Sequence, residues 1–258
     1  MRLMNTRDRL ETEFGVYSEW LAQAVADLAP SETIPVACRG TGRPELFRRI
    51  AGELRITARS LVLDVGSGLG GPGAWLMSET GCRVVGVDVM ETEVRASTRL
   101  FPQLEAVVAS AEELPWRDGC FSAAWALGVI EMVQEKDRVV AEIARVLKRN
   151  GRAAFYGFFS TKHRIEHLPS ANLFDPLKDL LRLLERNGLR VVSADKAESA
   201  QAPAPWHRAV EKARAQIKRE HAGDSRLILA ETQIGAFNWL RLRGEICDWV
   251  VIGEKMSG

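Results

Sequence analysis

The segment Leu61–Gly73, Leu-Val-Leu-Asp-Val-Gly-Ser-Gly-Leu-Gly-Gly-Pro-Gly, carries residue types that suit nucleotide binding. Its glycines lack Cβ atoms where a strand turns sharply into a helix, so a ligand can approach the backbone closely. The next strand ends in Asp88, a carboxylate placed to bind ribose hydroxyls. These residues predict a nucleotide site at the carboxyl edge of a parallel sheet. The alternatives are a tight turn that needs glycine without any ligand, and a solvated strand end at Asp88.

Asp64 bears on which nucleotide this site would take. The string Gly66-x-Gly68-x-x-Gly71 also matches the glycine fingerprint of dinucleotide-binding folds. An NAD(P)-dependent oxidoreductase is therefore one candidate function. Asp64 stands two residues before the first glycine, where a dinucleotide fold normally has an apolar strand residue. A carboxylate there suits a ligand with a cationic end, such as the amino group of methionine. The chain also lacks a Tyr-x-x-x-Lys dyad, which disfavours the short-chain dehydrogenase type.

The rest of the chain alternates strand and helix patterns that would position this site. Expected strands are 61–65, 84–88, 104–109, 121–130, 153–159, 189–194 and 247–251. Expected helices are 8–30, 44–54, 73–80, 91–100, 135–148, 176–186, 204–220 and 225–242, with a loop at 30–42 and a helix stop at Asn150-Gly151. This alternation predicts an α/β fold with a doubly wound parallel sheet.

Four motifs in order resemble those of class I S-adenosylmethionine-dependent methyltransferases, in particular the small-molecule type 11 group. They are Asp64-x-Gly66-x-Gly68-x-Gly70, Val84–Asp88, Ala111–Trp116 with Asp118, Gly119 and Phe121, and Ile143–Lys148 with Gly151-Arg152. The resemblance covers about residues 61–159. It implies a Rossmann-like seven-stranded sheet with the last strand antiparallel, N-terminal helices, and a helical insertion between strands six and seven. The corresponding domains are a helical cap at 1–58 and a methyltransferase domain at 59–258, with a lid insertion at about 204–242.

The same resemblance implies which residues contact S-adenosylmethionine. They are Asp64, Gly66, Ser67, Gly68 and Gly70 at the methionine end, Asp88 at the ribose, Val89, Ala111 and Glu112 at the adenine, and Leu127 near the sulfonium. The chain departs from the family pattern at Ser110, Ser122 and Met132, the last of which replaces a frequent histidine. Arg39, in an unusual Arg-Gly-Thr-Gly loop, could pair with the methionine carboxylate in a bidentate contact. The alternative is an exposed loop arginine.

Methyl transfer needs a base only when the attacking atom carries a proton at working pH. With Met132 at the histidine position, the candidates are Glu131 and His163, followed by His167 and His207. Glu131 could equally be a capping carboxylate, and each histidine could be a surface residue. Tyr17 and Trp20, on the first helix, are expected to form a lid over the cofactor, with core packing as the alternative.

Composition limits the classes of partner. The net charge of +1 over 258 residues gives no electrostatic reason to expect nucleic acid, and no apolar run could span a membrane. Four scattered cysteines and a polar N-terminus predict a cytoplasmic protein without a metal site, acting on a small molecule as a monomer or homodimer. Motifs typical of amino-group methylation on adenine or glutamine and of cytosine C5 methylation are absent, which disfavours a macromolecular acceptor. A non-methylating relative of the fold is the further alternative.

Overall fold

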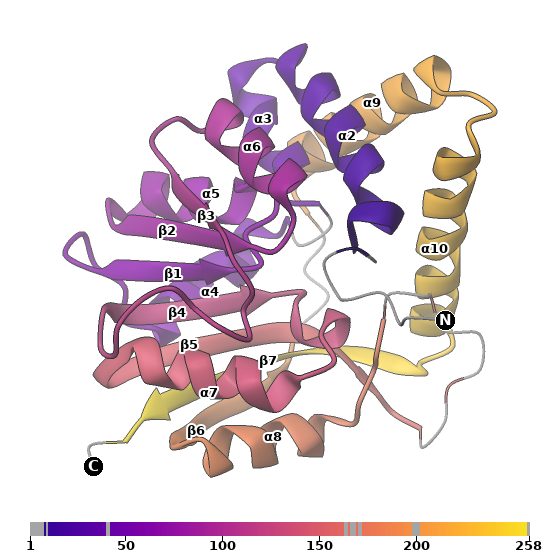
Figure 1. Cartoon of the computed structure of the whole chain (residues 1–258). Coiled ribbons are helices and arrows are strands. Elements are labelled where there is room, and N and C mark those ends of the chain that lie inside the picture. Colours follow the sequence, from indigo (N-terminus) through magenta and orange to yellow (C-terminus); the bar gives the residue numbers. More distant parts are fainter. Residues whose placement is uncertain are drawn as a thin grey trace.

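The computed structural model describes residues 8, 10–39, 42–162, 165, 169, 172–197 and 202–256. Seven strands form one sheet in the order β3-β2-β1-β4-β5-β7-β6 (Figure 1). The strands are β1 Leu61–Val65, β2 Arg83–Asp88, β3 Glu105–Val108, β4 Phe121–Leu127, β5 Leu147–Ser160, β6 Leu189–Lys196 and β7 Ile246–Lys255. The first five are paired in parallel, and β7 runs antiparallel to both β5 and β6. This topology confirms the predicted fold class, including the antiparallel last strand.

Helices cover both faces of the sheet and its carboxyl edge (Figure 1). They are η1 Glu11–Gly15, α2 Val16–Ala26, α3 Pro30–Ala37, α4 Pro44–Glu53, α5 Gly71–Thr80, α6 Glu91–Leu100, η2 Ile130–Met132, α7 Lys136–Val146, α8 Leu177–Arg186, α9 Ala204–Glu220 and α10 Ser225–Leu242. The insertion helices α9 and α10 begin and end at the residues predicted. Helices α2, α9 and α10 lie at the edge where the parallel strands end, so they surround the predicted site.

Two apolar cores lie on opposite faces of the sheet. One joins α2–α5 and α9 to the sheet and includes Phe47 and Trp125, which are fully buried. The other lies under α7 and α8 and includes Phe121 and Phe155. Because the N-terminal helices share a core with the strands, they pack as part of the sheet's covering layer. The division into domains at residue 58 stays a prediction.

The predicted loop at 30–42 was wrong over its first half, which forms α3. Its Pro and Ser residues favour turns, but Pro30 occupies the first helical turn, where its missing N–H group is not needed. The Glu32 carboxylate also accepts a hydrogen bond from the backbone N–H of Ala29 at 3.1 Å, which satisfies the start of the helix. Local side-chain capping therefore outweighed the turn signal.

Several predicted element ends were also wrong. The first helix, predicted over 8–30, ends at Ala26 of α2, and the last strand, predicted over 247–251, extends to Lys255. Helix α7 ends at Val146, because Leu147 already pairs with Phe121 in the sheet. The positive φ of 60° at Asn150 serves an irregularity inside β5 rather than a helix stop. Strand β4 ends at Leu127, after which Gly128, at φ 75°, turns the chain into η2.

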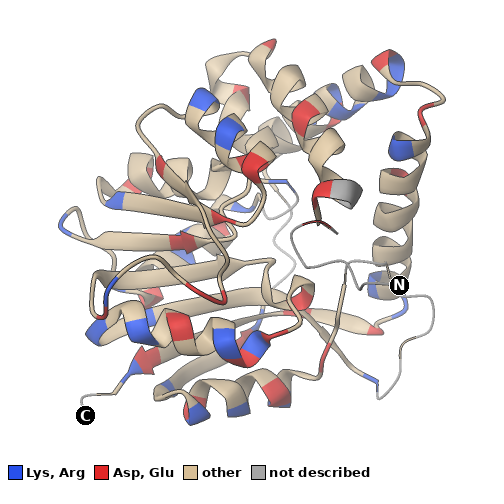
Figure 2. Ribbon diagram, in the orientation of Figure 1, with Lys and Arg blue, Asp and Glu red and all other residues tan. Residues whose placement is uncertain are grey.

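Charged residues of both signs are interspersed along the outer helices, whereas the central strands are mostly uncharged (Figure 2). Within the described part of the chain, no helix combines the length and the apolar character needed to cross a bilayer. The few carboxylates at the carboxyl edge of the sheet are therefore separated by mostly uncharged strands from the charged residues of the outer helices.

Candidate active site

The turn after β1 forms a backbone cradle. Gly66, Gly68 and Gly70 have φ values of 66°, 52° and 82°, which favour glycine. A Cβ on Gly66 would lie 2.4 Å from a Val129 methyl, and one on Gly70 would lie 2.6 Å from a Leu104 methyl. Gly68 differs from these two glycines. Among the described residues other than its chain neighbours, only a carboxylate oxygen lies near the position of its missing Cβ, at 3.8 Å. The loop is therefore packed tightly at two glycines and open at the middle one.

Asp64 is a buried carboxylate beside this loop, with 2% of its surface exposed. Its Oδ2 has no hydrogen-bond partner among the described residues. Burial raises the pKa of Asp64 to about 7; Trp125 and the Gly73 backbone lower it, and the charge of Asp88 raises it. An unsatisfied buried oxygen is costly, so a ligand with a cationic donor fits this position.

Asp88 ends β2 next to the same loop. Its Oδ2 accepts the backbone N–H of Gly68 at 2.9 Å, and its Oδ1 accepts that of Met90 at 2.9 Å. Burial raises the pKa of Asp88 to about 6, followed by the charge of Glu93, while the two backbone bonds and Arg39 act in the opposite direction. The carboxylate is therefore held in a fixed orientation, with lone pairs left for hydroxyl donors.

The remaining predicted cofactor residues line the same edge. The Oγ atom of Ser67 is buried without a partner. Val89 packs in a small apolar cluster with Leu10, Phe14, Met90 and Met132. Ala111 and Glu112 lie in the loop after β3, where the Ser110 hydroxyl accepts the Glu112 N–H at 3.1 Å. Leu127 ends β4 opposite Tyr156 of β5. The structure thus places these positions at or after the carboxyl ends of β1, β2, β3 and β4.

Arg39 does not lie at Asp64 in this structure. Its guanidinium forms an ion pair with Glu93 and donates to the Ser18 hydroxyl at 2.9 Å. Its backbone has a positive φ of 44°, which is uncommon for a residue with a side chain. Binding of a carboxylate ligand by Arg39 stays a prediction. Sequence reasoning missed Glu93 and Ser18, because nothing in the spacing joins residues 18, 39 and 93.

The structure places the two predicted lid aromatics against the insertion helices. The Trp20 ring stacks on His221, with centroids 3.9 Å apart, and the Arg226 guanidinium lies over its other face. Tyr17 borders a cavity between α2, α9 and α10 of about 210 Å³, next to Ile217. The side chains of the N-terminal segment that reach Val89 are instead those of Leu10 and Phe14. Leu10 and Phe14 are four residues apart, the spacing of one face of a helix, but this spacing alone does not mark them as neighbours of Val89.

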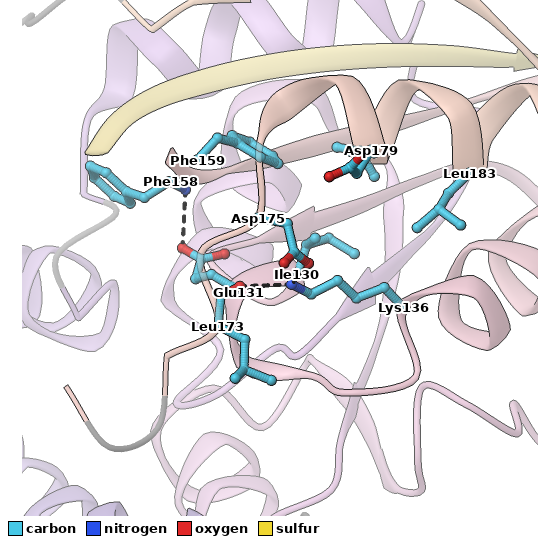
Figure 3. A pocket seen from close by; sticks show the side chains of 10 residues that line it. Ile130, Glu131, Lys136, Phe158, Phe159, Leu173, Asp175, Asp179 and Leu183 are labelled. Atoms are coloured by element: carbon cyan, nitrogen blue, oxygen red, sulfur yellow. Dashed lines mark hydrogen bonds and ion pairs between the residues drawn. The ribbon is translucent and has the colours of Figure 1, made fainter. Parts of the chain in front are cut away.

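Glu131, in η2, is buried with 5% of its surface exposed. Its Oε1 accepts the backbone N–H of Phe158 at 3.3 Å (Figure 3), and its Oε2 has no partner among the described residues. Burial raises the pKa of Glu131 to about 7, against the Phe158 hydrogen bond and the charge of Lys136. Next to it, Lys136 donates to Asp175 and to the carbonyl oxygen of Leu173, at the wall of a small cavity of about 20 Å³.

Of the histidine candidates, His163 and His167 lie outside the described residues, and His207 is exposed on α9. No group of three His, Cys, Asp or Glu side chains within the described residues lies close enough together to hold a metal ion.

An aromatic and basic cluster beside Glu131 was not predicted. The guanidinium of Arg43 hydrogen-bonds to the Tyr156 hydroxyl and pairs with Asp248 at 3.0 Å. Further along β5, the Phe158 ring packs edge-on against Phe237 of α10, with centroids 4.6 Å apart. The α10 helix therefore covers the carboxyl end of β5 with an apolar wall. These residues come from the start of α4, from β5, from β7 and from α10, so only the tertiary fold brings them together.

The strand order, the left-handed glycine loop and the carboxylates at its edge define a Rossmann-like methyltransferase fold of class I. Residues 63–155 match the family model described as a methyltransferase domain.

The comparisons with known proteins agree with this assignment. The chain is 35% identical to methyltransferase GfsG of Streptomyces halstedii over 132 residues, which are 48% of this chain and 46% of that protein. It therefore spans less than half the length of that relative. The crystal structure of the cyclase SpnF superposes with a TM-score of 0.67 at 20% identity, over 83% of this chain and 81% of that one. Haemonchus contortus phosphoethanolamine N-methyltransferase 2, solved with S-adenosyl-L-methionine, gives a TM-score of 0.71 at 14% identity, over 99% of this chain and 61% of that one.

Proposed function

We propose that this protein transfers a methyl group from S-adenosylmethionine to a small-molecule acceptor and releases S-adenosylhomocysteine. The observation that carries the proposal is the buried Asp64 carboxylate with an unpartnered Oδ2, beside a left-handed glycine loop and the oriented carboxylate of Asp88. A dinucleotide offers no cationic amino group to Asp64, whereas the methionine end of S-adenosylmethionine does. The family match over residues 63–155 supports the same activity.

The residues present fit this cofactor at each of its ends. Asp64 would receive the amino group, Asp88 the ribose hydroxyls, and Val89, with Ala111 and Glu112, the adenine. The glycine loop would let the cofactor lie against the backbone, with Ser67 as a further polar group. When bound, S-adenosylmethionine supplies an electrophilic methyl group on a sulfonium. Leu127 lies at the end of β4, where an apolar side chain can border that group.

The acceptor would lie between the ends of β4 and β5 and the covering helix α10. Glu131 is the described candidate for taking a proton from an acceptor hydroxyl, because its pKa of about 7 lets it act as a base near neutral pH. Phe158 and Phe237 would exclude water and hold an apolar acceptor in line with the methyl group. His163 stays a second candidate on the sequence alone.

Two features of the sequence support a small-molecule partner and a cytoplasmic location. The net charge of +1 provides no field that would attract nucleic acid, and the scattered cysteines suit a cytoplasmic protein. A monomer or homodimer is part of this proposal. The alternative of a non-methylating relative is kept because the cyclase SpnF shares the fold.

Calorimetry and a methylation assay together test the proposal. We expect S-adenosylhomocysteine to bind and NAD to give no heat of binding. Asp88→Ala should weaken S-adenosylhomocysteine binding by about 1.5–3 kcal/mol, the scale of hydrogen bonds to a charged group. A panel of hydroxyl- and amine-bearing metabolites, incubated with methyl-labelled cofactor, would then identify the acceptor. Tight NAD binding without binding of S-adenosylhomocysteine would overturn the proposal, and cofactor binding without any labelled product would favour the non-methylating relative.

A further inference from the structure

Glu93 is the most deeply buried acidic residue at the carboxyl edge of the sheet, with 1% of its surface exposed. It lies in the first turn of α6, a few residues after Asp88. Its Oε1 accepts the Ser18 hydroxyl at 2.5 Å and forms the ion pair with Arg39. Its Oε2 has no partner among the described residues. One carboxylate therefore has one oxygen that is fully engaged by the N-terminal helices and one that is free.

The free oxygen faces the open glycine of the loop. Oε2 of Glu93 lies 3.8 Å from the position that a Cβ would take on Gly68, and it is the only atom of the described residues within 4 Å of that position, apart from Gly68 and its two chain neighbours. The backbone N–H of Gly68 is bonded to Oδ2 of Asp88 at 2.9 Å. Gly68 is thus flanked by two carboxylates, one on its N–H and one on its side-chain face. The charge of Glu93 also raises the pKa of Asp88, as expected for two acidic groups at close range.

A buried carboxylate oxygen without a donor is costly, and the cost is removed when a ligand supplies one. The donors must come from the side of Gly68, since the other side of Glu93 is taken by Ser18 and Arg39. A vicinal diol offers two hydroxyl donors, one for each carboxylate. The proposed function already assigns the methionine amino group to Asp64, which lies on the strand before the loop.

We propose that Glu93 is a second ribose ligand, which binds one ribose hydroxyl while Asp88 binds the other. This inference rests on the proposed binding of S-adenosylmethionine. Because Ser18 of α2 holds the other oxygen of the same carboxylate, Glu93 also joins the ribose directly to the N-terminal helix. Loss of Glu93 should weaken every ligand that carries the ribose, whether or not it carries the methionine end.

The test measures binding by calorimetry with S-adenosylhomocysteine and with 5′-methylthioadenosine, which has the same ribose and adenine but no amino acid end. We expect Glu93→Gln to weaken both ligands by a similar factor of about tenfold. Ser18→Ala, the matched control, removes the Oε1 donor but leaves Oε2 in place, and we expect it to change both affinities by less than threefold. Should Glu93→Gln not fold, Glu93→Asp withdraws the carboxylate by one methylene and should give the same pattern.

Deoxy forms of 5′-methylthioadenosine identify the contact. One of the two compounds, 2′-deoxy or 3′-deoxy, lacks the hydroxyl that Glu93 binds. Compared with 5′-methylthioadenosine, this compound should bind more weakly to the wild type but no more weakly to Glu93→Gln. Equal losses in Glu93→Gln and Ser18→Ala would overturn the inference in favour of a structural role. A loss confined to S-adenosylhomocysteine would overturn it by placing Glu93 at the methionine end. If wild type binds S-adenosylhomocysteine and Glu93→Gln binds it equally well, only this inference fails; if wild type binds neither ligand, the proposed function fails first.

Discussion

The carboxylate of Glu131 occupies the space that a side chain on Gly157 would need. Its Oε2 lies 2.6 Å from the position of a Cβ on Gly157, and its Oε1 is bonded to the N–H of the next residue, Phe158. The short helix η2 therefore presses a buried acid directly onto the backbone of β5. Glycine at 157 is needed for this close approach and not for its backbone angle.

Gly157→Ala should displace Glu131 from the end of β5. The added methyl group cannot be accommodated unless the carboxylate moves, so we expect a loss of about 1–3 kcal/mol in the free energy of unfolding. For an acceptor that must lose a proton, we also expect kcat to fall under conditions where the variant remains folded. Urea unfolding and steady-state kinetics on the same samples measure the two effects. Unchanged kcat at full folding would remove Glu131 from the chemistry.

Glu131→Gln tests the base itself, because glutamine keeps the size of the side chain and an oxygen for the Phe158 N–H. For an acceptor hydroxyl, we expect the wild-type kcat to rise with pH through about 7, the pKa of Glu131. The variant should lose this rise and retain the affinity for S-adenosylhomocysteine. The same pH profile in both proteins would assign the proton transfer to another group, such as His163.

Stability without cofactor should fall as pH rises from about 4 to 7. Burial raises the pKa values of Asp64 and Glu131 to about 7 from lower values in the unfolded chain. Between those values the folded state binds more protons than the unfolded state, so raising the pH favours unfolding. We expect a loss of several kcal/mol from these groups over this range, since each tenfold change in proton affinity is worth about 1.4 kcal/mol. Asp64→Asn should reduce the pH dependence measured by urea unfolding, and an equally steep dependence in the variant would contradict this cause.

Gly71→Ala should disrupt the contact between α5 and α3. A Cβ on Gly71 would lie 2.5 Å from the carbonyl carbon of Ala37 and 2.6 Å from the nitrogen of Cys38, and backbone atoms cannot turn aside. We expect a loss of about 2–3 kcal/mol in the free energy of unfolding. Gly52→Ala in α4 is the matched control, since no atom lies within 4 Å of its Cβ position; it should stabilise by about 0.5–1 kcal/mol. Equal stability of the two variants would show that α3 is able to move away.

The N-terminal segment should become better protected when cofactor binds. Leu10 and Phe14 belong to the apolar cluster that includes Val89, which we propose lies at the adenine, so binding should order this cluster. We expect slower hydrogen exchange over residues 10–25 with S-adenosylhomocysteine, and weaker binding in Phe14→Ala. Tyr17→Ala is the comparison, because Tyr17 borders the cavity against α9 and α10. If Tyr17→Ala weakens binding more than Phe14→Ala, the original assignment of the lid to Tyr17 is the better one.

Local periodicity and turn chemistry were enough to predict most of the fold. The helices α6, α9 and α10 have the predicted bounds, and the glycine loop lies at the predicted strand end. Some of the wrong ends have causes in strand pairing, which a local sequence pattern does not include. Asn150 has the backbone angle expected of a helix stop, but pairing of Leu147 with Phe121 ends the helix earlier.

The candidate site could be predicted from the sequence only where its residues are also close to one another along the chain. Asp64 and Asp88 could be placed because each lies in the carboxyl-terminal part of a strand next to the loop. The contact of Glu93 with Ser18 joins residues 75 positions apart, and the pairing of Arg43 with Asp248 joins residues 205 positions apart. Such pairs depend on how helices pack across the sheet edge, which no local spacing encodes. The stacking of Trp20 on His221, the residue that follows α9, likewise joins distant parts of the chain.

The antiparallel strand β7 also affects how the chain reaches this fold. It lies between β5 and β6 and pairs with both, although 85 residues separate it from the end of β5. During synthesis, β5 and β6 are therefore complete well before the strand that joins them. Until β7 inserts, their unpaired N–H and C=O groups form open edges, which favour association between chains. The high sequence separation of these pairings predicts slow folding, with β7 insertion as the step that ends the period of exposure to aggregation.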